Sequence, residues 1–487
     1  MKISILPIVA TARYNRSMDE LVDRLRASLG HGCVLDAAGD IAPYGTDWRG
    51  LFDYRPRAVV RPADTAGVAA AVRLCAASGV AIVPQGGNTS MVGGAVPGAA
   101  DSQIVLSLAR MNAIRTIDRS GLTLEIEAGV TLRAAQLAAE AAGAFLPLSI
   151  SAEGSAQIGG VISTNAGGNN TLRFGNTRDL VLGLEVVLPD GRIWNGLRRL
   201  RKDNTGYALR HLFAGAEGTL GIITAAVLRL APMPRSRIAC FCGLPGIEAV
   251  LDLYRRLRDE DEAALYAFEY ISGTALDLAL RHLPGARLPL ERTAAHYALV
   301  ELATTRRAGD LGATLETVLG EALDAGSLDD AAIANSEAQR LAFWSLREHM
   351  ADAQKRAGAS TKNDVSVPVA AVPALLARAA DMLAQHYPGA RMAAFGHIGD
   401  GNIHLNVIQP DGADPAGFEA QGDELMERVN TIIADLGGSF SAEHGIGLLK
   451  RHAFATWRGE VERDVMLRIK AAIDPAAIMN PGKIFEP

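Results

Sequence analysis

The N-terminal region has the apolar spacing of an amphipathic helix. Residues 17–20 read Ser-Met-Asp-Glu, the sequence of a capping box, which predicts that a helix starts at Ser17. The apolar positions that follow share one helical face: Leu21, Val22, Leu25 and Leu29. Gly30 predicts the helix end. We therefore expect residues 1–50 to form a helical segment that packs on the first domain.

The next stretch combines a helix, a strand and a glycine-rich loop. A helix is predicted from about Thr65 to Ser78, and the apolar run 80–83 that follows it predicts a short strand. The strand leads directly into the loop 84–94, which contains four glycines. This order indicates an α+β nucleotide-binding layer rather than a helical bundle.

A domain boundary is predicted near Pro232 and Pro234, where the character of the chain changes. Strand-like runs precede it at 182–188 and 219–230, and further strand candidates follow it at 238–242, 265–271 and 297–302, with Ala-rich helices at 370–385 and 418–436. We therefore expect an α+β protein with a cofactor domain at 51–234, a second domain at 235–445, and a segment 446–487 that returns to the first domain.

The composition is that of an ordinary soluble globular protein, with 487 residues, of which 49% are hydrophobic and 21% charged. No apolar run in the sequence approaches the roughly 20 residues needed to span a bilayer. The net charge of −6, without a Lys/Arg-rich block, argues against nucleic-acid binding. Four cysteines in a chain of this length do not make a disulfide framework. We expect a cytoplasmic protein, and peripheral membrane association stays an open alternative.

Two glycine-rich loops, 84–94 and 154–168, carry the first chemical signal. Glycines allow the backbone to approach a ligand closely and to take positive φ, so that successive N–H groups can bind an anion. Both loops also carry Ser, Thr and Asn side chains, as a pyrophosphate-bearing cofactor would require. Neither loop has the Rossmann or the P-loop spacing. The alternative is that both are only tight turns at strand ends.

These loops resemble those of a known flavoprotein fold. Residues 84–94 look like the pyrophosphate loop of the fold shared by vanillyl-alcohol oxidase and p-cresol methylhydroxylase, and residues 154–168 resemble its second flavin loop. The strings at 201–207 and 213–224 are similar to the branch that contains the D-2-hydroxyglutarate and FAD-linked D-lactate dehydrogenases. The resemblance runs from about residue 40 to the end. It implies a two-subdomain FAD-binding fold and an α+β substrate (cap) domain with an antiparallel sheet.

The resemblance also implies which residues bind FAD. The implied set in the first loop is Pro84, Gly86, Gly87, Asn88, Thr89, Ser90, Gly93 and Gly94. The remaining positions are Gly154, Ser155, Gly159, Ser163, Asn165, Gly221 and Ile222, with Asn480 near the isoalloxazine. Covalently flavinylated relatives carry a histidine in the first loop, and none lies between Val83 and Pro97 here. We therefore expect FAD to be bound without a covalent link.

Two histidines flank an Asp-Gly pair in the segment 392–407. Asp-Gly is the preferred centre of a two-residue β-hairpin turn. A turn at this pair would place His397 directly opposite His404, with Asn406 on the same face and Ile403 toward the core. From spacing alone, the two histidines are either a buried hydrogen-bonded pair or two ligands of a metal ion, which would need a third.

Glu443 and His444 complete this constellation by resemblance. In the family, the string 438–447 follows the histidine hairpin, and His397, His404 and Glu443 match the metal ligands. His444 matches the catalytic base. Two histidines and one carboxylate with open positions suit zinc, and manganese stays an alternative.

Substrate binding is likewise assigned by resemblance. Arg347 and Lys362 match the cationic positions of the family, Asn406 matches its polar contact, and His444 also touches the substrate. The chain departs from the 2-hydroxyglutarate pattern at Ala351, where a threonine is usual. The lost hydroxyl weakens the case for glutarate, whereas Lys362 favours a substrate with two carboxylates.

The sequence thus predicts FAD- and metal-dependent oxidation of a D-2-hydroxy acid by hydride transfer to flavin N5. D-2-hydroxyglutarate is the favoured substrate, with D-lactate and D-malate as alternatives. A flavin oxidase, or an electron-transfer subunit that only carries flavin, is the competing interpretation. Electron-transferring flavoprotein or a quinone would be the acceptor typical of the family, and a homodimer stays open.

Overall fold

The computed structural model describes residues 6–307 and 310–486, with the side chains of the first helix described from Ser17 onwards. The chain divides into two compact units. Unit 1 is formed by the described residues up to Ala166, by Asn176–Ala231 and by the chain from His444 onwards. Unit 2 is formed by Gly167–Gly175 and Pro232–Glu443.

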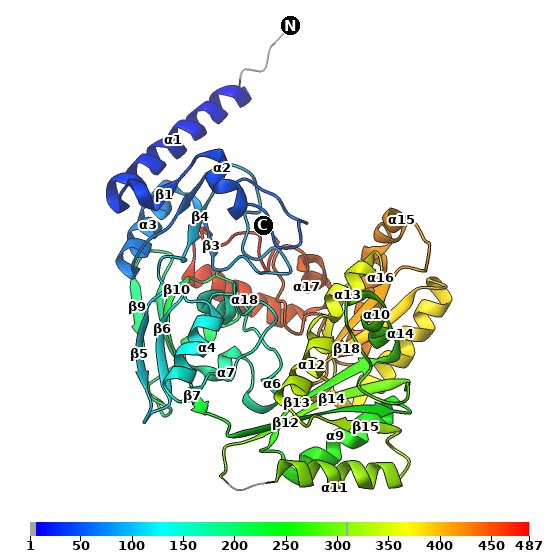
Figure 1. The fold of residues 1–487 in the computed structure, drawn as a ribbon. Coiled ribbons are helices and arrows are strands. Elements are labelled where there is room, and N and C mark those ends of the chain that lie inside the picture. Colours follow the sequence, from blue (N-terminus) through cyan, green and yellow to red (C-terminus); the bar gives the residue numbers. More distant parts are fainter. Residues whose placement is uncertain (1–5, 308–309, 487) are drawn as a thin grey trace. The chain divides into compact units, whose positions relative to one another are not determined.

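Unit 1 contains two principal sheets and a short two-stranded ladder (Figure 1). The first sheet has the order β1-β2-β4-β3, in which β4 runs parallel to β2 and β3. The second has the order β5-β6-β10-β8-β9 and is antiparallel. The strands are β1 (Val34–Leu35), β2 (Ala58–Val60), β3 (Ala81–Gln85), β4 (Gln103–Ser107), β5 (Ile114–Asp118), β6 (Thr123–Glu127), β7 (Ala144–Phe145), β8 (Val181–Val187), β9 (Ile193–Gly196), β10 (Ile222–Arg229) and β11 (Ala231–Pro232).

The helices of unit 1 test the sequence predictions directly. Helix α3 has the predicted bounds because the Asp64 side chain caps its first turn and Gly79, with φ 64°, ends it. Helix α1 contradicts the predicted start, since it begins at Leu6 and Ser17 lies inside it. The better signal was Pro7, which a first helical turn tolerates. Residues 1–5 lie outside the described residues. The helices are α1 (Leu6–Leu29), α2 (Ala38–Ile41), α3 (Thr65–Ser78), α4 (Leu132–Ala141), α5 (Ile158–Ser163), α7 (Thr177–Leu180), α8 (Arg210–Phe213), α17 (Arg451–Trp457) and α18 (Glu460–Ile473).

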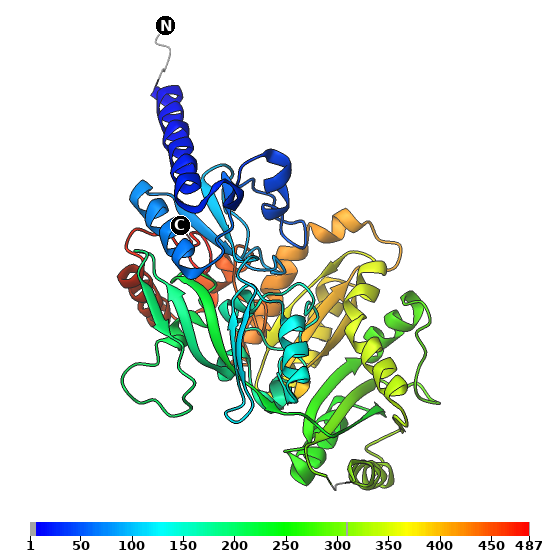
Figure 2. The same ribbon diagram turned by 60° about the vertical axis from the view of Figure 1, so that its left-hand side comes forward.

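The C-terminal segment, red in Figure 2, extends the first sheet of unit 1. Met479 forms a parallel bridge with Ile82 of β3. The N–H of Ile82 donates to Ile478 O, and the N–H of Asn480 donates to Ile82 O, both at 2.8 Å. Residues 478–480 therefore pair with a strand that lies about 400 positions earlier in the chain.

Unit 2 is built on one antiparallel sheet of eight strands, with the order β15-β12-β14-β13-β18-β19-β16 and β17 paired to β19. The strands are β12 (Ser236–Leu244), β13 (Leu265–Ser272), β14 (His296–Thr304), β15 (Asp330–Ile333), β16 (Ser360–Thr361), β17 (Asp364–Ser366), β18 (Arg391–Gly396) and β19 (Asn402–Ile408). The helices are α6 (Thr171–Phe174), α9 (Ile247–Asp261), α10 (Gly273–His282), α11 (Leu311–Asp324), α12 (Glu337–Glu348), α13 (Met350–Arg356), α14 (Val372–His386), α15 (Pro415–Glu419) and α16 (Gly422–Asp435). This antiparallel α+β domain was predicted.

Helices cover both faces of this sheet. One core cluster joins Leu405 and Val407 of β19 to α9, α11, α14 and α16. The other joins Phe395 of β18 to α10, α12 and α13. Alternate residues of each strand enter opposite clusters, as the pleat of a strand requires. The side of the sheet with α10, α12 and α13 also carries the polar groups described below.

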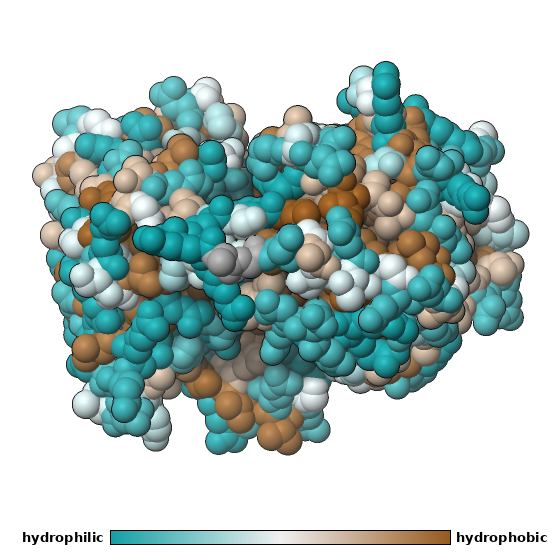
Figure 3. Space-filling view, turned by 60° about the horizontal axis from the view of Figure 1, so that its bottom comes forward, coloured by the Kyte–Doolittle hydropathy of each residue, from teal (hydrophilic) through white to brown (hydrophobic). Residues whose placement is uncertain are grey.

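Among the described residues, no helix combines the length and the apolar character that crossing a membrane requires. The face of the molecule drawn in Figure 3 is mostly hydrophilic, with apolar residues in small groups between polar ones.

Candidate active site

The first glycine loop follows β3 and approaches the second loop closely. A Cβ on Gly87 would lie 1.8 Å from Ser155 O, so only glycine permits this approach. Asn88 and Asn165 have φ near 50°, a left-handed conformation that asparagine tolerates better than most residues. Within the described residues, the backbone N–H groups of Gly87, Asn88 and Thr89 donate to no protein acceptor. The loops thus hold free backbone donors of the kind that bind an anion.

Eight buried polar side-chain atoms of unit 1 lack a hydrogen-bond partner in the described part of the chain, and three of them bear on the glycine loops. They are Asn480 Oδ1, Lys483 Nζ and Gln157 Oε1. Asn480 is otherwise well held, because its Nδ2 donates to Gly94 O at 3.0 Å and to Glu217 O at 2.7 Å. Gln157 Oε1 would lie 3.6 Å from a Cβ on Gly86, and Asn480 is bonded to Gly94, so these two unpartnered oxygens lie beside the first glycine loop, where a polar cofactor would supply hydrogen-bond partners.

The other predicted flavin residues lie in unit 1, and two of their side chains bond to nearby backbone: Ser163 Oγ donates to Gly159 O, and Ser90 is described next. Ser90 Oγ closes the first loop by accepting from the N–H of Val92 and of Gly94. A Cβ on Gly154 would meet no described heavy atom within 4 Å, so glycine is not needed there for space. The rest of the set is Pro84, Gly86, Gly93, Gly159, Ser163, Gly221 and Ile222.

The histidine turn of unit 2 differs from the predicted hairpin. Phe395, not His397, pairs with His404. A 3₁₀ turn, Ile398–Asp400, lies between β18 and β19, and Gly401 with φ 84° ends it. The prediction was wrong because Asp400 and Gly401 end a longer loop instead of forming a two-residue turn. Ile403 points into the core, as expected.

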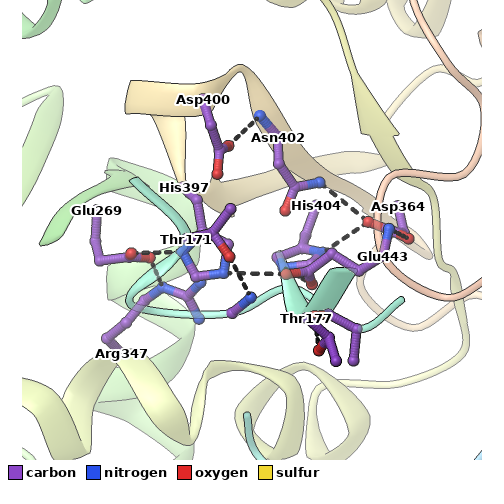
Figure 4. A network of polar contacts seen from close by, with 12 residues as sticks. Thr171, Thr177, Glu269, Arg347, Asp364, His397, Asp400, Asn402, His404 and Glu443 are labelled. Carbon is purple, nitrogen blue, oxygen red and sulfur yellow. Dashed lines mark hydrogen bonds and ion pairs between the residues drawn. The ribbon is translucent and has the colours of Figure 1, made fainter. Parts of the chain in front are cut away.

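The longer loop nevertheless brings the two histidines to one carboxylate (Figure 4). His397 Nε2 lies 3.4 Å from Glu443 Oε1, and His404 Nε2 lies 3.7 Å from Glu443 Oε2. One ligand atom from each of the three residues lies within 4.8 Å of the others. The spacing argument therefore failed on the register but identified residues that do come together.

Two further carboxylates, which the sequence prediction missed, face the other side of each imidazole. Glu269 Oε1 lies 2.5 Å from His397 Nδ1, and Asp364 Oδ1 lies 3.8 Å from His404 Nδ1. Asp364 Oδ2 also accepts the backbone N–H of Glu443 at 2.9 Å. The available signal was weak: Glu269 is the one carboxylate inside the otherwise apolar strand β13.

Burial and these carboxylates set the protonation of the cluster. Burial alone would lower the pKa of His397, but Glu269 and Glu443 outweigh it and raise that pKa to about 10. Burial lowers the pKa of His404 to about 4. For Glu269, burial is outweighed by the charges of His397 and Arg347, which lower its pKa to about 2. The cluster therefore attracts positive charge while it keeps one imidazole neutral.

Arg347 reaches the same carboxylate from α12. Its Nε donates to Glu269 Oε2 at 2.7 Å, and its guanidinium carbon lies 4.7 Å from the centroid of the Phe395 ring. Within the described residues, neither Nη atom of Arg347 has a hydrogen-bond partner. One edge of the guanidinium is thus fixed, and the other remains able to bind an anion.

The remaining predicted substrate residues are placed as follows. Asn406 is buried, and its amide donates to Gln354 and accepts from the N–H of Asn363. Lys362 is half-buried between β16 and β17. His444 directly follows Glu443 and begins the C-terminal part of unit 1. Ala351 is exposed in α13, beyond the helix break at His349.

The fold is that of the flavoproteins related to p-cresol methylhydroxylase, as predicted. A structure of p-cresol methylhydroxylase with substrate bound matches with a TM-score of 0.75 and 18% identity, over 96% of this chain and 97% of that chain. A structure of alkyldihydroxyacetonephosphate synthase matches with a TM-score of 0.73 and 18% identity, over 95% of this chain and 84% of that one. At such low identity these matches establish the fold alone.

Sequence comparison identifies the family within that fold. Residues 56–196 match the model of an FAD binding domain, and residues 233–484 match that of the C-terminal domain of FAD linked oxidases. A D-2-hydroxyglutarate dehydrogenase of Xanthomonas citri pv. viticola is 38% identical over 92% of this chain and 93% of its own. One of Stutzerimonas stutzeri is 37% identical over 96% and 98%, and the mitochondrial enzyme of Bos taurus is 36% identical over 93% and 81%. The chain therefore belongs to the FAD-linked oxidase family that includes these dehydrogenases, which confirms the predicted family.

Proposed function

We propose that this chain oxidises D-2-hydroxyglutarate to 2-oxoglutarate, with FAD as the electron acceptor and a divalent cation at His397, His404 and Glu443. The observation that carries the proposal is the similarity to D-2-hydroxyglutarate dehydrogenases, which extends over more than nine-tenths of the chain. The polar cluster of unit 2 supports it, because it holds an arginine for a carboxylate beside a donor set for a cation.

The residues of unit 1 fit FAD. The free N–H groups of Gly87, Asn88 and Thr89 suit a pyrophosphate. The buried polar atoms of Asn480 and Lys483 would find hydrogen-bond partners on such a polar cofactor. When bound, FAD supplies the acceptor for a hydride. Since the first loop contains no histidine, we propose that the cofactor is held without a covalent bond.

The donor set of unit 2 fits a divalent cation. Two imidazoles and one carboxylate are typical ligands of zinc, and manganese accepts the same set. Because Glu269 and Asp364 face the Nδ1 atoms, the Nε2 atoms of both histidines are the proposed ligands. When bound, the cation would act as a Lewis acid toward the substrate hydroxyl.

The side chains around this centre have separate proposed roles. Arg347 would bind the carboxylate next to the reacting carbon through its Nη atoms, since Glu269 occupies its Nε. Lys362 would bind the second carboxylate of a dicarboxylic acid. Asn406, whose amide Gln354 and Asn363 hold in place, would offer its remaining N–H to the substrate.

His444 is the proposed base. One of its ring nitrogens would take the proton of the C2 hydroxyl, so that the O–H electron pair forms the carbonyl while the hydrogen on C2 departs with its bonding pair as hydride. For reoxidation we propose an electron-transferring flavoprotein or a quinone, the acceptors that the family resemblance implies, and a cytoplasmic location.

An anaerobic absorbance titration of the purified holoprotein tests the proposal. The flavin band should bleach with D-2-hydroxyglutarate and not with its L-enantiomer. D-malate and D-lactate belong in the same series, because Ala351 replaces the usual threonine. A band that stays intact with all three D-acids would contradict the proposed function.

The base assignment is tested in the same titration. His444→Gln should retain yellow flavin and lose its reduction by substrate, whereas His452→Gln, an exposed histidine of the same segment, should behave as the unmodified protein. Similar reduction rates in both variants would contradict the role of His444.

A further inference from the structure

The short segment that carries His444 is held by carboxylates on both sides. Before it, the N–H of Glu443 donates to Asp364 Oδ2 at 2.9 Å. After it, the N–H groups of Ile446 and Gly447 donate to the two carboxylate oxygens of Glu217, at 2.7 and 2.8 Å. Only His444 and Gly445 lie between the two attachments.

The surroundings of Glu217 leave it little freedom. It is buried and has φ 51°, a left-handed conformation that is unfavourable in a residue with a Cβ. Its N–H donates to Ser163 O at 2.8 Å, and its C=O accepts from Asn480 Nδ2. Ser163 and Asn480 both belong to the predicted flavin set. The backbone of Glu217 is therefore fixed by two residues of the predicted flavin set, while its carboxylate holds the segment after His444.

The segment itself is shaped to accept this carboxylate. Gly445 has φ 76°, and a Cβ added there would lie 2.7 Å from Glu217 Oε1. Gly447 has φ 52°, its N–H donates to the other oxygen, and a Cβ added there would lie 2.2 Å from Val92 O. Residues with a side chain rarely adopt either backbone conformation, so glycine is required at both positions beside Glu217.

We propose that Glu217 is a positioning residue for His444, which fixes the base with respect to the flavin-binding loops of unit 1; this inference rests on the proposed function. This role requires no contact between the carboxylate and substrate or cofactor. The carboxylate acts through two charge-assisted hydrogen bonds to backbone N–H groups, which are stronger than neutral ones. The competing interpretation is that Glu217 only supports the flavin loops.

Glu217→Gln separates the two interpretations, because an amide can accept one of the two N–H groups and presents a donor to the other. If Glu217 positions His444, the variant should keep FAD with an affinity within about threefold, whereas its anaerobic flavin reduction should slow by roughly ten- to a hundredfold. The substrate concentration at half-maximal reduction should change little. Lost FAD, with a normal reduction rate per bound flavin, would overturn the proposal.

Glu185→Gln is the matched control. Glu185 is also a buried carboxylate of unit 1, and it accepts from Thr65, Thr224 and Arg115 rather than from this segment. This control should leave the reduction rate and FAD binding unchanged. If flavin reduction slowed equally in both variants, the cause would be the loss of any buried charge, and the proposal would be overturned.

Amide hydrogen exchange adds a readout that does not depend on turnover. In Glu217→Gln, the peptide containing Ile446 and Gly447 should exchange roughly tenfold faster or more, with other peptides of unit 1 unchanged. Unchanged exchange there would overturn the proposal. If no hydroxy acid reduces the unmodified protein, the proposed function fails, and this exchange still reports whether Glu217 holds the segment.

Gly445→Ala covers the case in which Glu217→Gln does not fold. It keeps the carboxylate and displaces the segment, because the new Cβ would approach Glu217 Oε1 to 2.7 Å. The same slow reduction with retained FAD is expected. Reduction at the unmodified rate would overturn the proposal.

Discussion

Replacing Glu269 by glutamine removes the single negative charge that Arg347 and His397 share. The carboxylate receives Arg347 Nε at 2.7 Å and His397 Nδ1 at 2.5 Å. Hydrogen bonds to charged groups contribute about 1.5–3 kcal/mol each. Glutamine has nearly the same side-chain volume as glutamate and keeps one acceptor oxygen, so about one such hydrogen bond is lost. The lost interaction free energy is on the order of 2 kcal/mol. That corresponds to roughly a 30-fold change in an equilibrium constant.

The loss should appear in cation affinity and in substrate binding together. We expect the dissociation constant of Zn²⁺ or Mn²⁺ to rise roughly 30-fold, within the range of 10 to 100 that is usual for partners of metal ligands. Competition against a chromophoric chelator measures it on the FAD-loaded protein. The KM for the hydroxy acid should rise as well, because Glu269 also fixes Arg347.

The neighbouring strand offers a matched control. Glu301 of β14 is also buried and accepts from Arg340 Nη1 and Trp344 Nε1, outside the histidine cluster. Glu301→Gln should destabilise the fold and leave the cation affinity unchanged. If Glu269→Gln bound the cation as tightly as the unmodified protein, or if Glu301→Gln lost it equally, the reasoning would be refuted.

Two further outcomes are expected in unit 1. Gly87→Ala should abolish FAD binding, because the new Cβ would lie 1.8 Å from Ser155 O. Gly154→Ala is the control and should retain FAD, because its Cβ would meet no described atom within 4 Å. Equal flavin contents in the two purified variants would contradict this prediction. Burial, with a smaller contribution from Arg451, lowers the pKa of Lys483 from 10.5 to about 7. Between pH 10.5 and pH 7 this lysine is therefore protonated in the unfolded chain and neutral in the folded one. The free energy of unfolding falls as the pH drops through that window. Lys483→Met should therefore gain stability over the unmodified protein as the pH falls from about 10 to about 7, by an amount on the order of 5 kcal/mol at most, and the gain should level off below pH 7. Thermal unfolding of both proteins across this range measures the difference, and a difference independent of pH would contradict the stated cause.

The sequence predicted elements that local signals define. Helix α3 has an N-cap aspartate and a C-terminal glycine, and strand β13 is apolar apart from Glu269 and the terminal Ser272, so both are recognisable without tertiary information. The start of α1 was misplaced because a capping-box sequence can also stand inside a helix. The register of β18 and β19 was misplaced because Asp-Gly can end a 3₁₀ turn as well as centre a hairpin.

The site was predictable only where motifs were contiguous. His397, His404, Glu443 and His444 stand in two short strings, so resemblance could identify them. Glu269 and Glu217 were missed because each acts on a partner far along the chain. Glu269 meets His397 across 128 positions, and Glu217 meets Ile446 across 229. The local sequence around Glu269 or Glu217 therefore does not predict which distant residue it contacts.

The pairing of β3 with the C-terminal segment has a consequence for biosynthesis. β3 lies at one edge of its sheet. Its outer side is paired only after Ile478 and Asn480 have been synthesised, nearly 400 residues after Ile82. At about 5–20 residues per second, a ribosome needs on the order of 20–80 s to make that length of chain. During this time the strand edge is open to pairing with another polypeptide. A product that ends before Ile478 would keep this edge open permanently, so nascent and truncated forms are the ones that we expect chaperones and proteases to recognise.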